Sequence, residues 1–287
     1  MSPYENIGIV YYGLLPDAAE LAGALAKTYA SGRRWWLATQ SDLDQREDDL
    51  TSTDLIITIG GDGTILRGVH IAAPGNIPVL GVNMGRVGFM SDIEAREAID
   101  EMGWYLEGNA RTERRYMLKA EILGRDTNPV FALNDIAVAR GALLRVVEVS
   151  TVVDDVHLAT YRGDGVIVST ATGSTGYSLQ LGGPVMDPTS RDFIVKPIAT
   201  HMSQFGGVIL RESSKVELTV RADDETILNA DGFIDHPLSA GQTVRIAQSG
   251  TYASFLRRKQ PAEFWGELSR RLGLRKGSRK STRRRRI

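Results

Sequence analysis

The sequence predicts an α/β domain built on a parallel sheet, followed by a largely β domain and a terminal helix. Strand-like and helix-like segments alternate over the first hundred residues, which is typical of a parallel sheet with crossover helices. After Gly108, short segments rich in β-branched residues follow one another with turn residues between them. Helical spacing of apolar residues returns only near the C-terminus, over residues 262–272.

The first domain is expected over residues 1–108. Its strands are predicted at three apolar runs, residues 7–12, 55–59 and 78–82. Asp17 opens a helix that Gly32 ends, and further helices are predicted from Thr64 towards Ala72 and over residues 93–106. Short buried strands that alternate with such helices indicate a Rossmann-like parallel sheet.

The second domain is expected over residues 109–256 and is β-rich. Its strands are predicted at residues 117–122, 136–139, 146–153, 166–169, 216–220 and 244–247. Residues 257–275 are expected to form a C-terminal helix that packs back on the first domain. Residues 276–286 contain no apolar side chain, so 276–287 are predicted to be a basic, disordered tail.

Composition excludes several classes of protein. The chain of 287 residues has no cysteine, which removes disulfides and thiolate chemistry and suits a reducing, cytoplasmic location. No stretch approaches the roughly 20 apolar residues of a membrane span, and no secretory signal is recognisable, so no membrane partner is expected. Residues 257–287 carry 13 Lys or Arg against 2 Glu, although the whole chain has a net charge of −1. A solvated tail is favoured over a nucleic-acid-binding one.

The sharpest local pattern joins an apolar strand to a glycine-rich turn and a helix start. Residues 56–59 run directly into Gly60-Gly61-Asp62-Gly63-Thr64. Glycines let backbone N–H groups turn towards phosphate oxygens, and the helix N-terminus adds partial positive charge. Asp62 would repel phosphates, so it is expected either to accept a proton from an attacking hydroxyl or to hold Mg²⁺. The structural alternative is a helix cap in a tight turn.

A second pattern lies between Tyr161 and Pro184, YRGDGVIVSTATGSTGYSLQLGGP. A Gly-Asp-Gly at 163–165 precedes a β-branched strand and a loop dense in hydroxyls and glycines. Glycines let a flat ring or a phosphate approach the backbone, and hydroxyls donate and accept hydrogen bonds. This mixture suits an adenine nucleotide. The hydroxyl-bearing residues are Thr170, Thr172, Ser174, Thr175 and Tyr177.

A third pattern, Asn134-Asp135, sits at the start of an apolar strand and by itself indicates only a turn. Together, however, the three segments resemble the NAD kinase family. The Gly60–Thr64 loop, Asn134-Asp135 and the stretch Gly163–Gly183 match the family's motifs. Further similarity runs through residues 80–90 and Phe264-Trp265, so the resemblance covers the chain from Ile7 to about Leu272.

The resemblance implies an enzyme that transfers the terminal phosphate of ATP, or of another phosphoryl donor, to the 2′-hydroxyl of the adenosine ribose of NAD, giving NADP. Asp62 would be the general base. Asn134, Thr172 and Thr175 would hold the adenine with Phe89 nearby, Asp135 and Tyr177 would contact ribose hydroxyls, and Asp164 would contact the nicotinamide amide. The other expected NAD-site residues are Gly63, Arg67, Arg145, Arg162, Gly176, Ser178 and Gln180. The phosphate loop would be Gly60, Gly61, Gly63 and Thr64.

The resemblance also implies Mg²⁺ or another divalent cation, whose ligands the sequence does not identify, and a homodimer or homotetramer with the substrate between its two domains. One departure stands out. Family members often carry a glutamine after the Asp-Gly of a late strand, and here Phe233 follows Asp231-Gly232.

Two rival functions remain open from the residues. A lipid kinase acting on diacylglycerol or a sphingoid base would share the Gly-Gly-Asp-Gly loop but would need an apolar acyl groove, which the polar 172–177 loop does not indicate. A non-enzymatic nucleotide-sensing regulator would use its basic tail on nucleic acid in a salt-sensitive way. Nucleic acid is not the expected partner.

Overall fold

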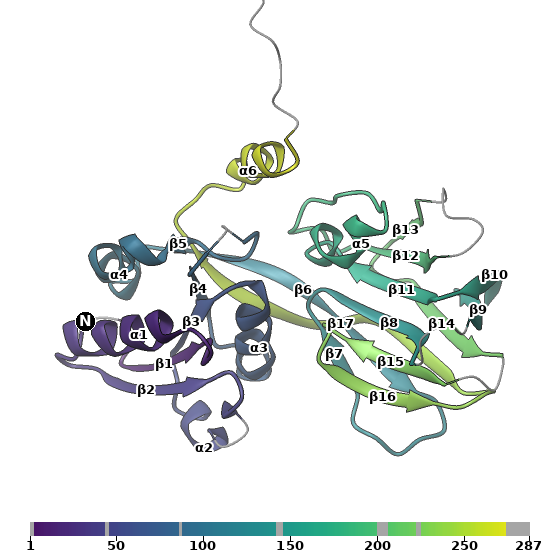
Figure 1. Cartoon of the computed structure of the whole chain (residues 1–287), viewed down its shortest axis with the longest axis horizontal. Coiled ribbons are helices and arrows are strands. Elements are labelled where there is room, and N and C mark those ends of the chain that lie inside the picture. The colour runs from purple at the N-terminus through teal and green to yellow at the C-terminus, as the bar shows by residue number, and fades with distance from the viewer. Residues whose placement is uncertain are drawn as a thin grey trace, which may run out of the picture.

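One large sheet runs through both lobes of the molecule (Figure 1). The computed structural model describes residues 3–43, 46–85, 88–141, 146–199, 206–221 and 225–273. The main path of this sheet has the strand order β10-β9-β14-β17-β4-β3-β1-β2, with β5 beside β4 and with β6 pairing β17 and β7. The long strands β6 and β17 therefore join the two lobes.

The N-terminal lobe has a parallel sheet that is covered on both faces. Strands β1, β2, β3 and β4 pair in parallel, as crossover helices require. One face packs on α1 and α4 through residues such as Ile9, Leu25 and Met102, and the other packs on α3 through Val10, Ile56 and Val69. The elements are β1 Asn6–Tyr11, α1 Pro16–Thr28, β2 Arg34–Thr39, α2 Glu47–Leu50, β3 Leu55–Gly60, α3 Asp62–Ala72, η2 Ala73–Gly75, β4 Val79–Asn83, β5 Ile93–Glu94, η3 Ala95–Glu97 and α4 Ala98–Leu106.

The C-terminal lobe is a β-sandwich. Its second sheet has the order β13-β12-β11-β8-β15-β16 and packs on the β9, β14, β17 and β6 part of the large sheet. Its elements are β6 Arg111–Ile122, β7 Val130–Ala132, β8 Asp135–Arg140, β9 Val147–Val153, β10 Val156–Gly163, β11 Gly165–Thr170, η4 Gly173–Thr175, α5 Tyr177–Gln180, β12 Phe193–Ile198, β13 Val208–Leu210, β14 Lys215–Val220, β15 Thr226–Ala230, β16 Ile234–Leu238 and β17 Thr243–Arg257. The terminal helix is α6 Glu263–Arg271.

The predicted fold class is confirmed: a parallel-rich α/β lobe, a β-rich lobe and a terminal helix. One predicted helix, over residues 93–106, is wrong in its first part. Ile93 pairs with Val82 as β5, a 3₁₀ turn follows, and α4 begins only at Ala98. Strand β2 was not anticipated. The division at residues 108 and 256 stays a prediction, and the basic tail 276–287 lies outside the described residues.

Candidate active site

The predicted phosphate loop connects the carboxyl end of buried strand β3 to the first turn of α3. A Cβ on Gly60 would lie 2.8 Å from Cβ of Thr64, so the close approach of these residues requires glycine. Thr64 is fixed in turn, because its Oγ1 donates to Oε1 of Gln40 over 3.2 Å. A Cβ on Gly61 or Gly63 would meet nothing within 4 Å. The loop therefore has a packed side and an open side with room for a ligand.

Asp62 is the first residue of α3, and its carboxylate is largely buried. Its Oδ1 has no hydrogen-bond partner, and a Cβ on Gly88 would lie 2.7 Å from its Cγ. Burial raises the pKa of Asp62, while the backbone N–H groups of Phe89 and Met90 and the charge of Arg271 act in the opposite direction. The result is a carboxyl group that holds a proton more readily than an ordinary aspartate. A general base works best when its pKa lies closer to the working pH, so this shift favours base catalysis.

Helix α6 covers the loop that touches Asp62. The guanidinium of Arg271 lies 3.9 Å from the ring centroid of Phe89 and donates to the carbonyl of Gly88. Phe264 also packs against this ring, with 5.9 Å between its ring centroid and that of Phe89. Glu267 holds Arg271 through an ion pair of 2.7 Å. The sequence-predicted adenine neighbour, Phe89, is therefore in contact with the terminal helix.

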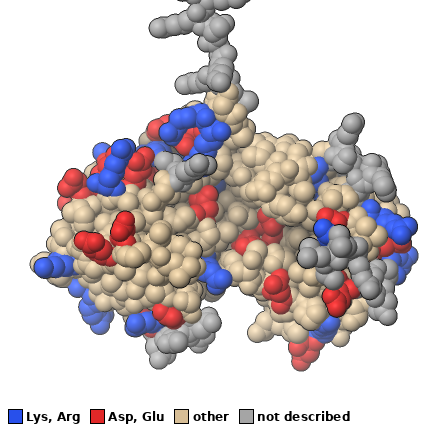
Figure 2. All heavy atoms as spheres, in the orientation of Figure 1, with Lys and Arg blue, Asp and Glu red and all other residues tan. Residues whose placement is uncertain are grey.

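Two cavities lie on either side of the Asp231-Gly232 turn, and these two residues line both. In Figure 2 a hollow separates the lobes, and acidic side chains are visible on its walls. One cavity, of about 530 Å³, is lined by Gly61, Gly63, Thr64 and Arg67 of the predicted phosphate and NAD sites. The other, of about 490 Å³, is lined by Asn134, Asp135, Asp164 and Tyr177. The structure thus brings these eight predicted residues into two adjoining cavities.

Asp231 holds the backbone segment that lines the second cavity. Its carboxylate accepts hydrogen bonds from the backbone N–H groups of Leu133, Asn134 and Asp135, over 2.8, 2.7 and 3.1 Å. Burial, and then the charge of Asp231, raise the pKa of Asp135 to about 7. Asp231 was noted in the sequence only as part of an Asp-Gly pair. That pair was the available signal, because Asp and Gly tolerate the left-handed backbone of a tight turn, and Asp231 has a φ of +51°.

The glycine-rich stretch folds tightly against the Asn134 segment. A Cβ on Gly173 would lie 2.5 Å from the carbonyl carbon of Asn134. Thr170 Oγ1 donates to the carbonyl of Leu133 over 2.5 Å, and Ser174 Oγ donates to that of Ala171 over 2.6 Å. These two hydroxyls, which the sequence offered to a ligand, hold the loop together instead.

The remaining predicted residues of this stretch surround the turn into α5. Thr172 Oγ1 lies 3.5 Å from Nη1 of Arg115, and Thr175 Oγ1 donates to the carbonyl of Thr172 over 3.0 Å. Gly176 precedes α5, which contains Ser178 and Gln180, and the Oγ of Ser178 is buried without a partner. Among the described residues, these five do not line either of the two cavities.

The predicted arginines differ in their placement. Arg67 lies in the phosphate-loop cavity, with its guanidinium 4.5 Å from the ring centroid of Phe233. Arg162 is exposed on β10, where it lies opposite Glu148 of β9 in the strand register. Arg145 lies outside the described residues. The arginine that does line the second cavity, with Asn134, Asp135, Asp164 and Tyr177, is Arg140, which was not predicted.

Arg140 ends strand β8, and its Nη2 forms an ion pair of 3.1 Å with Oδ2 of Asp164. The pair closes one side of the cavity that Asn134 and Tyr177 also line. A basic residue at the end of a β-branched strand carries no distinctive sequence signal, so this one was missed.

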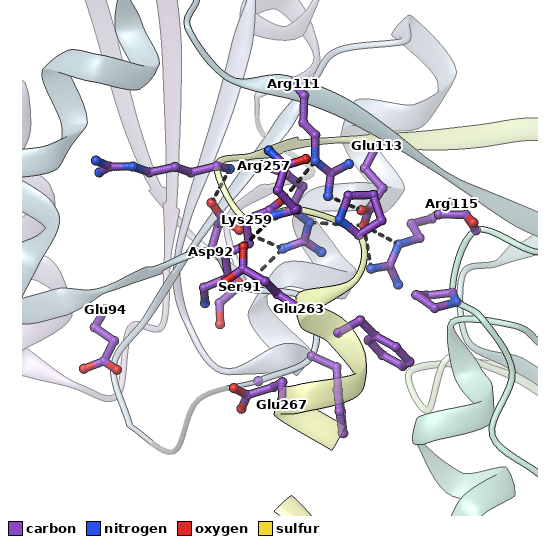
Figure 3. A pocket seen from close by; sticks show the side chains of 18 of the residues that line it. Ser91, Asp92, Glu94, Arg111, Glu113, Arg115, Arg257, Lys259, Glu263 and Glu267 are labelled. Atoms are coloured by element: carbon purple, nitrogen blue, oxygen red, sulfur yellow. Dashed lines mark hydrogen bonds and ion pairs between the residues drawn. The ribbon is translucent and has the colours of Figure 1, made fainter. Parts of the chain in front are cut away.

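A cluster of charged side chains joins the candidate site to the stem formed by β6 and β17 (Figure 3). Glu113 Oε1 accepts from Arg115 Nη2 over 2.6 Å and from Arg257 Nε over 3.3 Å, and all three residues are buried. Arg257 Nη1 donates to the carbonyls of Met90 and Ser91 over 2.8 and 3.1 Å. The cluster therefore anchors the loop whose backbone faces Asp62.

Family models match most of the chain. A model described as the ATP-NAD kinase N-terminal domain matches residues 18–110, and one described as the ATP-NAD kinase C-terminal domain matches residues 133–258. A curated relative named NAD kinase from Dehalococcoides mccartyi (strain CBDB1) is 40% identical over 273 residues, covering 94% of this chain and 96% of the relative. An NAD kinase from Chloroflexus aurantiacus (strain ATCC 29366 / DSM 635 / J-10-fl) is 32% identical, covering 93% of this chain and 98% of the relative.

Solved structures agree at the level of the fold. A yeast NADH kinase complexed with NADH superposes with a TM-score of 0.82 at 23% identity, covering 98% of this chain and 91% of that one. An NAD kinase from Archaeoglobus fulgidus in complex with ATP gives a TM-score of 0.73 at 27% identity, covering 92% of this chain and 98% of that one. The arrangement of the two lobes is thus shared with both.

Proposed function

The chain belongs to the NAD kinase family, and on that premise we propose that it phosphorylates the 2′-hydroxyl of the adenosine ribose of NAD, with Asp62 as the general base. The product is NADP, and ATP or another phosphoryl donor supplies the phosphate. The observation that carries this assignment is the buried Asp62 carboxylate at the glycine-rich start of α3, with Oδ1 unpartnered and the pKa raised by burial. The lipid-kinase and nucleotide-sensor alternatives find no support in the matched family models or the relatives.

The residues of the proposed site divide between the phosphoryl donor and the acceptor. The open space beside Gly61 and Gly63, the positive end of α3 and the Arg67 guanidinium suit phosphate oxygens. Asn134, Thr172 and Thr175 would hold the adenine with Phe89 nearby, Asp135 and Tyr177 would contact ribose hydroxyls, and Asp164 the nicotinamide amide. Gly176, Ser178, Gln180, Arg145 and Arg162 complete the set of residues proposed to bind NAD.

Catalysis at such a site depends on alignment and charge neutralisation, because phosphoryl transfer asks for little covalent chemistry from the protein. The ribose hydroxyl must lie in line with the terminal phosphorus, and its proton must leave as the new bond to oxygen forms. Asp62 takes that proton. Removal of water from around its carboxylate favours the protonated product of this step, which is the same effect that raises its pKa.

Mg²⁺ or another divalent cation is part of the proposal. Among the described residues, no group of three or more His, Asp or Glu side chains is arranged to hold a metal ion. Mg²⁺ in phosphotransferases keeps several waters and is bound by substrate phosphates with one or two carboxylates. The described residues are compatible with a cation that arrives with the triphosphate and is held chiefly by its phosphates. When bound, it would neutralise charge on the phosphates.

The proposal extends to the state of the protein in the cell. Family membership supports a homodimer or homotetramer. The absence of cysteine from the sequence supports a cytoplasmic location. Within the described residues, no helix has the length and apolarity that crossing a membrane demands. Light scattering coupled to gel filtration distinguishes a dimer from a tetramer, and a monomer would contradict the proposed assembly.

The direct test of the function is mass spectrometry of products. Purified protein is incubated with Mg²⁺ and ATP or polyphosphate, and with NAD or diacylglycerol as the acceptor. We expect NADP from NAD and no phosphorylated lipid. Phosphorylation of diacylglycerol without NADP would support the lipid-kinase alternative, and no ATP consumption with either acceptor would support the sensor.

A further inference from the structure

A histidine connects the last turn of α3 to the second cavity, where we propose that NAD binds. His70 lies eight residues after Asp62 on the same helix, and its Nε2 is 2.7 Å from Oδ2 of Asp231. The side chain of His70 is 15% exposed and that of Asp231 is fully buried. This hydrogen bond joins the N-terminal lobe to the turn between β15 and β16 in the C-terminal lobe.

The Asp231 carboxylate is fully occupied by hydrogen bonds. Oδ1 accepts from the N–H groups of Asn134 and Asp135, and Oδ2 accepts from that of Leu133. Because these partners are all donors, the fourth bond also needs a donor, so Nε2 of His70 carries the hydrogen. The backbone N–H of Asp231 in return donates to the carbonyl of Asp135 over 3.0 Å. Asp231 thus has no free oxygen with which to act on a substrate.

Helix α3 therefore carries the proposed base at one end and an attachment to the acceptor cavity at the other. Eight helical residues span about 12 Å. A helix of this length transmits a shift at His70 to Asp62, since its backbone hydrogen bonds keep it rigid. The segment 133–135, by contrast, is held to the Asp231 carboxylate by three hydrogen bonds from its backbone N–H groups, and these do not involve His70.

We propose that His70 is a positioning residue for phosphoryl transfer: by donating to Asp231, it fixes the distance between the Asp62 carboxylate and the ribose bound beside Asn134 and Asp135. The proposal rests on the NAD kinase function proposed above, and in it His70 acts through Asp231. Loss of the bond leaves the backbone hydrogen bonds of the acceptor cavity in place and removes the attachment of α3 to the Asp231 turn, so kcat falls while KM for NAD changes little. A displacement of about 1 Å can reduce the rate about 100-fold.

His70 also packs against Phe233, with ring centroids 4.9 Å apart at an interplanar angle of 73°. A purely structural role would rest on this ring contact and not on the hydrogen bond. Two variants separate the possibilities. His70→Gln keeps a donor at the end of a side chain of similar reach, whereas His70→Met has similar length and no donor. The ring contact is lost in both.

The experiment measures steady-state NADP formation by the full-length protein and its variants with NAD, ATP and Mg²⁺. We expect His70→Met to lower kcat about 10- to 100-fold with KM for NAD within about threefold of wild type. His70→Gln should stay within about threefold of wild type in both constants. His157→Met is the matched control. It removes another hydrogen bond made by a histidine, which joins His157 Nε2 to Thr160 Oγ1 over 3.1 Å at an exposed part of strand β10.

Three results would overturn the inference: wild-type kcat in His70→Met, an equal loss of kcat in the Gln and Met variants, or a loss expressed in KM alone. If His70→Met does not fold, as judged by circular dichroism, His70→Phe serves as the donor-free variant and keeps an aromatic ring against Phe233. A wild-type protein that makes no NADP refutes the assigned function itself. Active wild type with an unaffected donor-free variant refutes the role of His70 alone.

Discussion

At the residue scale, two buried carboxyl groups of the candidate site experience different surroundings. Asp62 sits at the positive end of α3, where a negative charge is favoured, yet its burial raises the pKa. Asp135 has the charge of Asp231 nearby in addition to its burial, and its pKa rises to about 7. Two carboxyl groups with separate environments are suited to separate roles.

The role of Asp62 predicts a selective loss of turnover. Asp62→Asn keeps the shape of the side chain but cannot take a proton, so kcat should fall about 10²- to 10⁴-fold. Binding of NAD, measured by isothermal titration calorimetry, should be largely unchanged. Asp17→Asn, at an exposed first-turn position of α1, is the matched control. Normal turnover of the Asp62 variant would reassign this residue to a structural role.

The pKa of Asp135 predicts a pH dependence of stability. The unfolded chain releases this proton near the ordinary value of 3.8, whereas the folded protein releases it near 7. Between these values the folded state holds more protons, so the free energy of unfolding falls as pH rises through this window. Asp135→Asn lacks this loss. Its free energy of unfolding, relative to that of wild type, should therefore rise by about 2 to 4 kcal/mol between pH 4 and pH 8.

Urea unfolding of both proteins at several pH values measures this difference directly. Asp126→Asn, at an exposed position, serves as the control and should follow the wild-type curve. A constant difference between wild type and Asp135→Asn across the pH range would contradict the raised pKa.

At the element scale, the tight contact between η4 and the start of β8 depends on one glycine. The Cβ of an alanine at position 173 would enter the backbone of Asn134, which cannot move away as a flexible side chain can. Gly173→Ala should therefore destabilise the protein by about 1 to 3 kcal/mol and weaken NAD binding. Thermal unfolding and NAD titration check both.

Gly176→Ala is the matched variant in the same loop. The nearest atom to its Cβ, the carbonyl oxygen of Gly173, is 3.3 Å away, so the loss of stability should be clearly smaller. An equal loss in the two variants would mean that loop entropy, and not the contact with Asn134, explains the effect.

Elements near the phosphate loop were predictable because local pattern and tertiary packing agree there. Strand β3 is a β-branched, largely apolar run that is buried along its whole length, and α3 has a buried face at helical spacing. Where packing overrides the local pattern, prediction failed. Ile93 reads as the start of a helix, but it pairs with Val82 of β4 as part of the short strand β5.

The candidate site was predictable only in its motifs. Glycine-rich turns and Asn134-Asp135 stand out in the sequence because their backbone requirements restrict residue choice. Arg140 and His70 do not stand out, since each acts through a partner distant in the chain. The pair His70 and Asp231 is separated by 161 residues, a contact that no local pattern encodes.

At the scale of the whole molecule, the two lobes and the terminal helix meet around the buried Glu113–Arg115–Arg257 cluster (Figure 3). Burial raises the pKa of Glu113, but Arg115, Arg257 and Arg111 outweigh this effect and bring it down to about 2. The stabilisation from this ionised group is complete above the unfolded value of 4.5 and is lost as pH falls towards 2.

Removing that charge should be costly, because two buried guanidinium groups would then face each other. Glu113→Gln is expected to lower the free energy of unfolding at pH 7 by about 3 to 5 kcal/mol, as measured with urea. Glu121→Gln, at a more exposed position of the same strand, is the control and should change stability little. If the Glu113 variant were as stable as wild type at pH 7, the cluster would not hold the lobes together.

The account as a whole depends on where the Asp62 carboxylate lies relative to the acceptor hydroxyl. A crystal structure of the Asp62→Asn variant with NAD and a non-hydrolysable triphosphate measures this distance directly. The account predicts that the side chain at position 62 lies within about 2.6 to 3.2 Å of the 2′-oxygen of the adenosine ribose. An adenosine ribose bound elsewhere, out of reach of this side chain, would contradict it.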